Sequence, residues 1–271
     1  MKHERVRRWR HHFRPLVDLV FPRVCGLCNA PVVDLQREAL CARCEFQLVA
    51  TEHRCLRCSA PLNAARRVSR SAQKRCYYCE RRRWSFRQAY CYTAYSGLAA
   101  RATKRIKQPD HEPLAIEIGI KMANWLLQSE DFDVSRFDCV VPVPQHWMRR
   151  IVTRYNQAEV LAEQVANAIG LPLNRRCLYR TRWTEKQGTK SINERLGAVV
   201  NSFACKPLQS LQDAGVLLID DVVTSGATAS DAARALRKAG AARVDVAAFS
   251  RGVGAFKKAS AKLPDVNASN P

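Results

Sequence analysis

Several familiar sequence features are missing from this chain of 271 residues, and each absence excludes a class of protein. No run of 18 apolar residues occurs, so no segment is expected to span a membrane. The basic residues 1–14 lead into no long apolar stretch, which argues against a secretory signal. Neither the GxGxxG fingerprint of dinucleotide-binding domains nor the GxxxxGKS or GxxxxGKT loop of nucleoside triphosphatases is present.

Acidic residues are scarce compared with basic ones. The chain has 45 Lys and Arg against 24 Asp and Glu, which gives a formal net charge of +21. Residues 1–90 hold 20 of the basic residues and 7 of the acidic ones, so they carry more than half of this excess. A surface of this kind attracts polyanions without specificity. Two interpretations stay open: the basic residues contact nucleic acid, or they are solvated and keep the protein soluble.

Cysteine, in contrast, is abundant: there are 12, and eight of them form four CxxC pairs. The paired residues are Cys25, Cys28, Cys41, Cys44, Cys55, Cys58, Cys76 and Cys79. Two CxxC pairs complete an all-sulfur Zn²⁺ site with no open position, which is the structural rather than the catalytic pattern. Four repeats in a short basic segment argue against the alternative of redox motifs. A segment this short has little core, so Zn²⁺ is expected to supply much of its folding energy.

The pairing of these motifs is not fixed by spacing. The simplest arrangement is sequential, with 25/28 joined to 41/44 and 55/58 joined to 76/79. A crossed arrangement, with 41/44 joined to 55/58, stays open. Reduced thiols also indicate a reducing compartment, and we expect the cytoplasm.

The stretch 216–228, VLLIDDVVTSGAT, predicts a buried strand, a loop and the start of a helix. Small residues from Thr224 to Thr228 allow several backbone N–H groups to point at one spot beside a helix N-terminus, which is an anion-binding arrangement. Thr228 and Asp231 resemble a capping box, so the helix is expected to begin at Thr228. The alternative is a polar turn that caps a helix and binds nothing.

Two acids precede this loop and suggest what the anion belongs to. Asp220 and Asp221 would repel a phosphate, but they can accept hydrogen bonds from a vicinal diol such as the 2- and 3-hydroxyls of ribose. The hydroxyls of Thr224, Ser225 and Thr228 can donate to phosphate oxygens. A phosphate next to a diol describes a ribose 5-phosphate.

The same string resembles the phosphoribosyl-pyrophosphate (PRPP) motif of type I phosphoribosyltransferases at each of its positions. The resemblance implies that the loop Thr224, Ser225, Gly226, Ala227 and Thr228 binds the 5-phosphate, and that Asp220 and Asp221 bind the ribose. It also implies Mg²⁺, held largely by the pyrophosphate and the ribose hydroxyls. By position, Lys107 and Arg195 are expected to offset charge on departing pyrophosphate. No pattern identifies the acceptor.

From Ala89 onward, expected strands and helices alternate. We expect strands at 90–95, 137–144 and 243–250, helices at 97–107, 113–128 and 156–169, and a mobile loop at 180–195. Asn156 is expected to cap the helix at 156–169, and Gly170 to end it. This order predicts an α/β fold with a mainly parallel sheet and a ligand at the carboxyl ends of its strands.

Together these features resemble the ComF family over residues 16–251. The resemblance rests on the cysteine pairs, YSGLAARATKRIKQ, VVPVP, RYNQAEVLA, the PRPP string and the spaced Arg180, Thr184, Gln187 and Arg195. It implies a double zinc ribbon fused to a type I phosphoribosyltransferase-like domain. It also implies a role in DNA uptake during natural transformation, with single-stranded DNA and other competence proteins as partners. Whether the protein is an enzyme is left open.

The resulting division has a basic arm at 1–23, a double zinc ribbon at 24–88, the transferase-like domain at 89–251 and a disordered tail at 252–271. Within 80–88, Trp84 and Phe86 lie among arginines and predict either base stacking or docking of the two domains. The main hypothesis is a PRPP-binding transferase-like protein. The alternative is a zinc-stabilised DNA-binding factor that uses the transferase fold as a scaffold or PRPP sensor. The oligomeric state stays open.

Overall fold

The computed structural model describes residues 23–32, 39–62, 76–80, 82–145, 155–181, 202–206 and 209–252. The basic arm, up to residue 22, and the tail from 253 lie outside the described residues. So does the segment 182–200 with Thr184, Gln187 and Arg195. The expectations of a disordered tail and a mobile loop therefore stay predictions.

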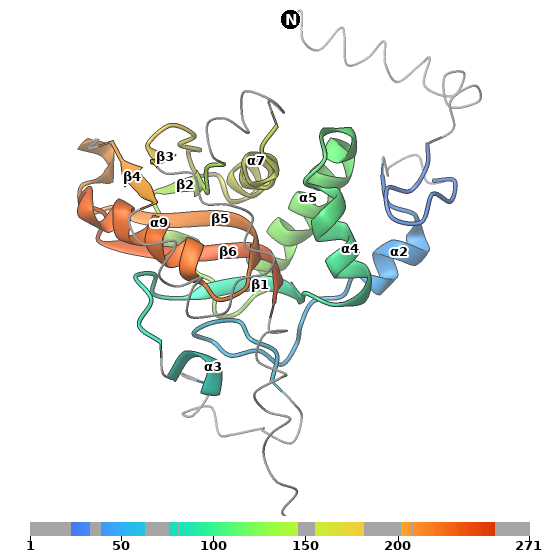
Figure 1. The fold of residues 1–271 in the computed structure, drawn as a ribbon, viewed down its shortest axis with the longest axis horizontal. Helices are drawn as coiled ribbons and strands as arrows, with labels where there is room; N and C mark the ends of the chain where they lie inside the picture. The colour runs from blue at the N-terminus through green and yellow to red at the C-terminus, as the bar shows by residue number, and fades with distance from the viewer. Residues whose placement is uncertain are drawn as a thin grey trace, which may run out of the picture.

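A parallel sheet forms the centre of the described structure (Figure 1). Its strand order is β1-β6-β5-β2, with bounds Ala89–Ala94, Arg243–Arg251, Gly215–Val223 and Cys139–Pro142. All three neighbouring pairs are parallel, so the predicted α/β fold with a parallel sheet is confirmed. Because β5 is central and buried on both faces, it reads as the continuous apolar run seen in the sequence.

Helices cover both faces of this sheet. Alternate residues of β5 face two separate cores: Leu217 and Ile219 pack with α5 and α7, whereas Val216 and Leu218 pack with α9. The helices are α4 Gly97–Arg105, α5 Glu112–Gln128, α7 Gln157–Ile169 and α9 Ala227–Lys238, with 3-10 turns η3 Pro109–His111, η4 Val134–Arg136 and η5 Gln209–Leu211. The chain from 89 therefore forms three layers, with β5 shared by both cores.

Two helix ends follow the sequence expectation and one does not. The Asn156 side chain accepts a hydrogen bond from the Ala158 N–H, and Gly170 ends α7 in the left-handed region at φ 72°, as expected. The predicted capping box at Thr228 and Asp231 is wrong, because α9 begins one residue earlier, at Ala227. The residue before it is Gly226, with φ 78°. Asp231 makes a longer-range contact instead.

That contact holds a short hairpin against α9. Strands β3 Leu178–Arg180 and β4 Phe203–Cys205 pair antiparallel. A carboxylate oxygen of Asp231 accepts hydrogen bonds from the N–H groups of Ser202, at 2.7 Å, and Phe203, at 3.2 Å. Asp231 therefore attaches the start of β4 to α9.

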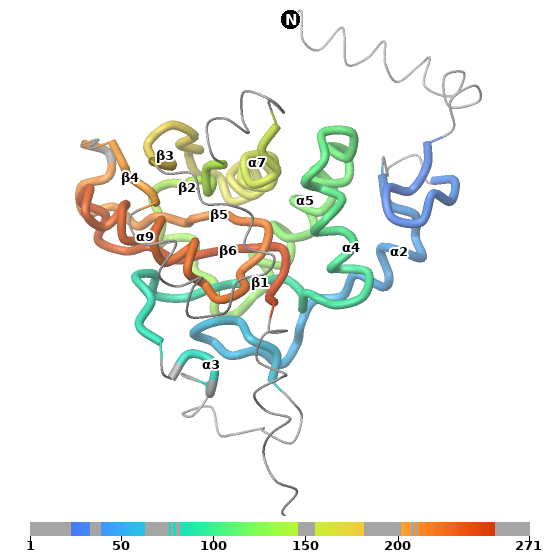
Figure 2. Tube along the Cα trace, viewed as in Figure 1, coloured from blue at the N-terminus to red at the C-terminus, as the bar shows by residue number. Residues whose placement is uncertain are grey.

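The cysteine-rich part of the chain contacts the rest of the structure at two places, beside α4 and α5 and beside β1 (Figure 2). We call residues 23–32 and 39–48, with helix α2 Ala42–Gln47, the first ribbon, and residues 51–62 and 76–80, with helix α3 Tyr77–Glu80, the second ribbon. The first ribbon adds Leu27 and Leu40 to the core around α5. The second runs beside β1, where the Ala89 N–H donates to Arg57 O at 3.0 Å. In the described part of the chain, every helix is too short or too polar to cross a bilayer.

Candidate functional site: a phosphate loop backed by a zinc ribbon

Residues 224–226 form the loop between the carboxyl end of β5 and the N-terminus of α9. We call this loop the phosphate loop, because the sequence predicts that it binds a phosphate. Gly226 occupies the last loop position, where its positive φ of 78° favours glycine. A Cβ at this position would lie 2.8 Å from Nε1 of Trp84, so a side chain would also be excluded sterically. Glycine is thus required twice, by the turn and by the residue packed behind it.

The carbonyl groups of this loop are held from behind. Nη1 of Arg251 donates to the carbonyls of Val223, at 2.8 Å, and of Thr224. The Ser225 carbonyl accepts from Nε1 of Trp84 and from Nη1 of Arg82, both at 3.2 Å.

This arrangement also fixes where the amides point. In a trans peptide the N–H group is directed opposite to the preceding carbonyl, and the described chain has no cis bond. The N–H groups of Thr224, Ser225 and Gly226 therefore point away from the second ribbon. They add to the N-terminal end of α9, which favours an anion.

The two acids lie at the end of β5 and differ in their contacts. Asp221 pairs with Lys107, whose Nζ lies 2.8 Å from Oδ2 of the carboxylate. Burial works to lower the pKa of Lys107, but the charge of Asp221, the hydrogen bond to it and the charge of Asp220 together raise that pKa above its usual value. The structure thus brings together three residues singled out in the sequence, with Lys107 bound to an acid.

Among the described residues, Asp220 forms no ion pair of this kind, although the charge of Lys107 acts on it from its place at Asp221. Its Oδ1 accepts a hydrogen bond from the Asp221 N–H at 2.8 Å. Burial, followed by the negative charge of Asp221, raises the pKa of Asp220 well above the ordinary value. A buried carboxyl group with a raised pKa, next to a second buried acid and a loop at a helix N-terminus, is typical of a ligand site rather than of solvated surface acids.

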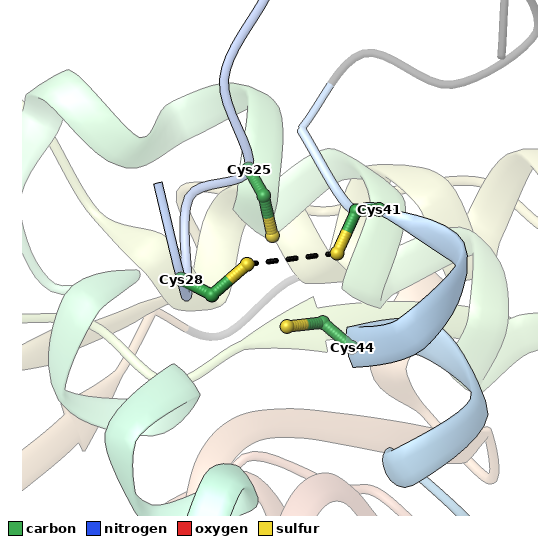
Figure 3. Close-up of side chains that lie close together, drawn as sticks. All are labelled: Cys25, Cys28, Cys41 and Cys44. Atoms are coloured by element: carbon green, nitrogen blue, oxygen red, sulfur yellow. Dashed lines mark hydrogen bonds between the residues drawn. The ribbon is translucent and has the colours of Figure 1, made fainter. Parts of the chain in front are cut away.

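The first group of thiols comes from two segments of the first ribbon (Figure 3). The Sγ atoms of Cys25, Cys28, Cys41 and Cys44 all lie within 4.8 Å of one another, and those of Cys28 and Cys41 are 3.6 Å apart. In a tetrahedral site with Zn–S bonds of about 2.3 Å, neighbouring sulfurs lie about 3.8 Å apart. The residues therefore fit Zn²⁺. Burial works to raise the pKa of Cys25, but backbone hydrogen bonds outweigh it and hold that pKa at about 7, which favours a thiolate ligand.

The second group also fits Zn²⁺ and is more buried. Sγ of Cys55 lies 3.8 Å from that of Cys79, and Sγ of Cys58 lies 3.5 Å from that of Cys76. Hydrogen bonds from the other three thiols lower the pKa of Cys55. Both groups follow the sequential arrangement, and Zn²⁺ in each would join two separate segments of the chain.

The aromatic residues between the ribbons and β1 dock the two parts of the protein. Trp84 stacks on Phe86 with ring centroids 5.1 Å apart, and Phe86 is only 1% exposed. Base stacking on Phe86 is therefore wrong, because its ring is buried in the core around α9. The sequence did not single out Arg251, since only the folded chain shows what a basic residue at the end of a strand contacts.

Comparisons with known proteins agree with this architecture. A family described as a double zinc ribbon domain matches residues 16–80, and a phosphoribosyl transferase domain matches residues 151–268. Strands β1 and β2 precede the second match but belong to the same sheet. The fold and the site thus define a class of protein: a double zinc ribbon followed by a phosphoribosyltransferase domain.

Two curated proteins are similar to this chain in sequence. The chain is 24% identical over 234 residues to the DNA utilization protein YhgH of Salmonella typhimurium, covering 84% of this chain and 96% of the relative. It is 28% identical over 115 residues to competence protein F of Haemophilus influenzae, covering 42% and 50%. The chain is thus similar to DNA utilization and competence proteins and has both expected domains, which confirms the resemblance to the ComF family that its sequence indicated.

Among solved structures, the glutamine PRPP amidotransferase from B. subtilis is similar to this chain. The identity is 21% and the TM-score 0.33, covering 48% of this chain and 26% of that one. The chain spans about a quarter of that enzyme.

The metal sites generate a first prediction. The purified protein should contain about two Zn²⁺ per chain by elemental analysis, and Cys28→Ser and Cys55→Ser should each lose one. Cys55→Ser should lower Tm more, because the buried residues in the described part of the second ribbon are mostly zinc-binding cysteines, whereas the first ribbon shares a large core with α5. Cys205→Ser, outside both groups, is the control and should retain both ions. Full zinc content in Cys55→Ser would contradict the assignment.

The pKa of Asp220 generates a second prediction. Because this pKa is raised in the folded protein, the carboxyl group stabilises the fold fully only below its unfolded pKa, and stability is lost as pH rises through the folded value. Asp220→Asn should therefore raise Tm by a few degrees at about pH 8, with a difference that shrinks as the pH approaches 4. Exposed Asp110→Asn is the control and should leave Tm unchanged. A lower Tm for Asp220→Asn at both pH values would disprove this account.

Proposed function

We propose that this protein binds PRPP or ribose 5-phosphate at the loop Thr224–Thr228. One observation supports this most directly: the carbonyls of Val223, Thr224 and Ser225 are all bound from behind, so the intervening N–H groups face outward. A terminal phosphate is the anion that suits several converging N–H groups at a helix N-terminus. The neighbouring acids then select a phosphate that carries a diol.

Each residue of the site has a role in this proposal. The hydroxyls of Thr224, Ser225 and Thr228 donate to phosphate oxygens, and Gly226 and Ala227 contribute backbone N–H groups. Asp220 and Asp221 accept from the ribose hydroxyls. In this structure the Lys107 ammonium group pairs with Asp221. When PRPP binds, this group moves from Asp221 to the more negative pyrophosphate.

A phosphoribosyl transfer would use the same contacts. Pyrophosphate leaves C1 of the ribose while positive charge develops on the ring, and the carboxylates of Asp220 and Asp221 lie beside that charge. Lys107 and Arg195 offset the charge on the leaving group. The hard carboxylate and hydroxyl oxygens suit Mg²⁺, which would supply further neutralisation of the pyrophosphate when bound.

The cellular role that we propose is DNA uptake or use in natural transformation. The names of the relatives, competence protein F and DNA utilization protein, support it. Zinc ligation by eight thiols requires that they stay reduced, which supports a cytoplasmic location. The division at residue 88, between ribbons and transferase-like domain, is part of the proposal, as are other competence proteins as partners.

Calorimetry tests the ligand. PRPP should bind in the presence of Mg²⁺, and Asp220→Asn combined with Asp221→Asn should weaken binding at least about 100-fold, since two hydrogen-bonded ionic contacts are lost. Asp110→Asn, an exposed acid of η3, is the matched control and should bind as the parent does. Unchanged affinity in the double variant would reject the site. Release of pyrophosphate in the same samples would distinguish transfer from binding.

A second candidate function is binding of single-stranded DNA by the first ribbon. Phe46 on α2 is 84% exposed, and Arg43 of the same helix and Arg101 of α4 line a cavity of about 920 Å³ beside Cys28. The exposed ring of Phe46 lies one helical turn from Arg43. An aromatic ring and arginines on one surface suit stacking of bases and neutralisation of phosphates.

Fluorescence anisotropy with a labelled single-stranded oligonucleotide tests this surface. Phe46→Ala should weaken binding about 10-fold, within the range found for loss of a base–aromatic stack, and should leave the salt dependence unchanged. Arg43→Gln with Arg101→Gln should reduce the salt dependence instead. Tyr179→Ala, an exposed aromatic of β3, is the control. Equal binding by the parent and the Phe46 variant would reject stacking at this site.

A further inference from the structure

We propose that the second zinc ribbon sets the conformation of the phosphate loop, so that loss of Zn²⁺ from Cys55, Cys58, Cys76 and Cys79 loosens the loop and lowers its affinity for a sugar phosphate. Each side chain that donates to the loop carbonyls also contacts this ribbon, and the Gly252 N–H is a further donor to the Val223 carbonyl. The statement about affinity rests on the proposed function, whereas the statement about loop conformation does not.

Arg251 provides the first connection. Its side chain is buried, although it ends β6 at the edge of the phosphate loop. Nε donates to the carbonyl of the zinc-binding residue Cys58 at 2.8 Å, while Nη1 donates to Val223 O and Thr224 O. One planar guanidinium group therefore joins a zinc-binding turn to the phosphate loop, and its fixed geometry transmits a displacement of either.

Arg82 and Trp84 provide the second connection. The Arg82 N–H donates to the carbonyl of Cys79 at 3.2 Å, which places Arg82 directly after the last zinc-binding turn. The Trp84 ring packs against the small core of the second ribbon. Both side chains donate to Ser225 O. The carbonyl of the central loop residue is thus bound only through groups whose positions depend on that ribbon, among the contacts of the described residues.

The second ribbon needs its metal to hold these positions. Its buried apolar cluster comprises Cys55, Cys58, Cys79 and Ala60, so most of its core consists of zinc ligands. Without Zn²⁺ the four thiolates repel one another or must take up protons, and a segment this small has little other core. The turn at Cys58 and the turn at Cys79 would then move independently. Arg251, Arg82 and Trp84 would lose the common support that aligns the loop carbonyls.

The first ribbon offers an internal comparison. It is attached elsewhere: Nη1 of Arg105 donates to Gly26 O at 2.5 Å, and the Ala39 N–H donates to Oε1 of Glu117 at 2.7 Å. These contacts lie on α4 and α5 rather than on residues 223–227. Loss of the first metal should therefore destabilise the protein without opening the phosphate loop.

The experiment compares two single-cysteine variants of the full chain. Cys76→Ser removes the second zinc and Cys28→Ser the first, with zinc content measured for both. Amide hydrogen exchange at residues 221–227 should be about 10-fold faster or more in Cys76→Ser, and within about 2-fold of the parent in Cys28→Ser. Calorimetry with ribose 5-phosphate should show at least about 10-fold weaker binding for Cys76→Ser and unchanged binding for Cys28→Ser.

The two readouts separate the ways in which the proposal can fail. If the parent does not bind ribose 5-phosphate, the proposed function fails, and loop exchange still tests the coupling. Equal loop exchange in Cys76→Ser and the parent, with one zinc lost, would overturn the coupling. If Cys76→Ser does not fold, Arg251→Lys provides the test. This variant keeps both metal sites and the positive charge but loses the planar guanidinium group. It should accelerate amide hydrogen exchange at residues 223–225. Unchanged exchange in that variant would overturn the proposal as well.

Discussion

The protein depends on how the backbone carbonyls at the end of β5 are bound. A loop that presents its N–H groups to an anion must direct its carbonyls the other way, and buried carbonyls need donors. Here the donors are the Gly252 N–H and three long side chains, Arg251 on β6 and Arg82 and Trp84 beside the second ribbon. The phosphate loop is therefore shaped jointly by the sheet and by the ribbon behind it.

A second constraint is the concentration of charge at this edge of the sheet. Two adjacent buried carboxylates repel each other, and the nearby Lys107 ion-pairs directly with Asp221 while the pKa of Asp220 stays raised. The site is thus less stable than a neutral one would be, which is typical of positions selected for binding rather than for folding. Its geometry is also maintained from the other side, since Asp231 holds the β3–β4 hairpin to α9.

The two zinc sites have the same ligands and different surroundings. The first shares a large apolar core with α5, whereas the second has a core made mostly of its own cysteines and lies against the phosphate loop. Metal binding therefore has different consequences at the two sites. Stability depends on both, but only the second is connected to the candidate ligand site through side-chain hydrogen bonds of the described residues.

The sequence by itself determined the elements whose causes are local. The apolar run before Asp220, the Asn156 cap and the CxxC spacing predicted the central strand, the start of α7 and the zinc ligands, because each depends on neighbouring residues. Tertiary structure alone decided that Asp231 binds a hairpin rather than its own helix end, that Lys107 pairs with Asp221, and that Arg251 joins Cys58 to the phosphate loop. These contacts link residues that lie between 29 and 193 positions apart in the sequence. No local pattern encodes them, because long polar side chains find their partners only after the sheet and the ribbon have packed together.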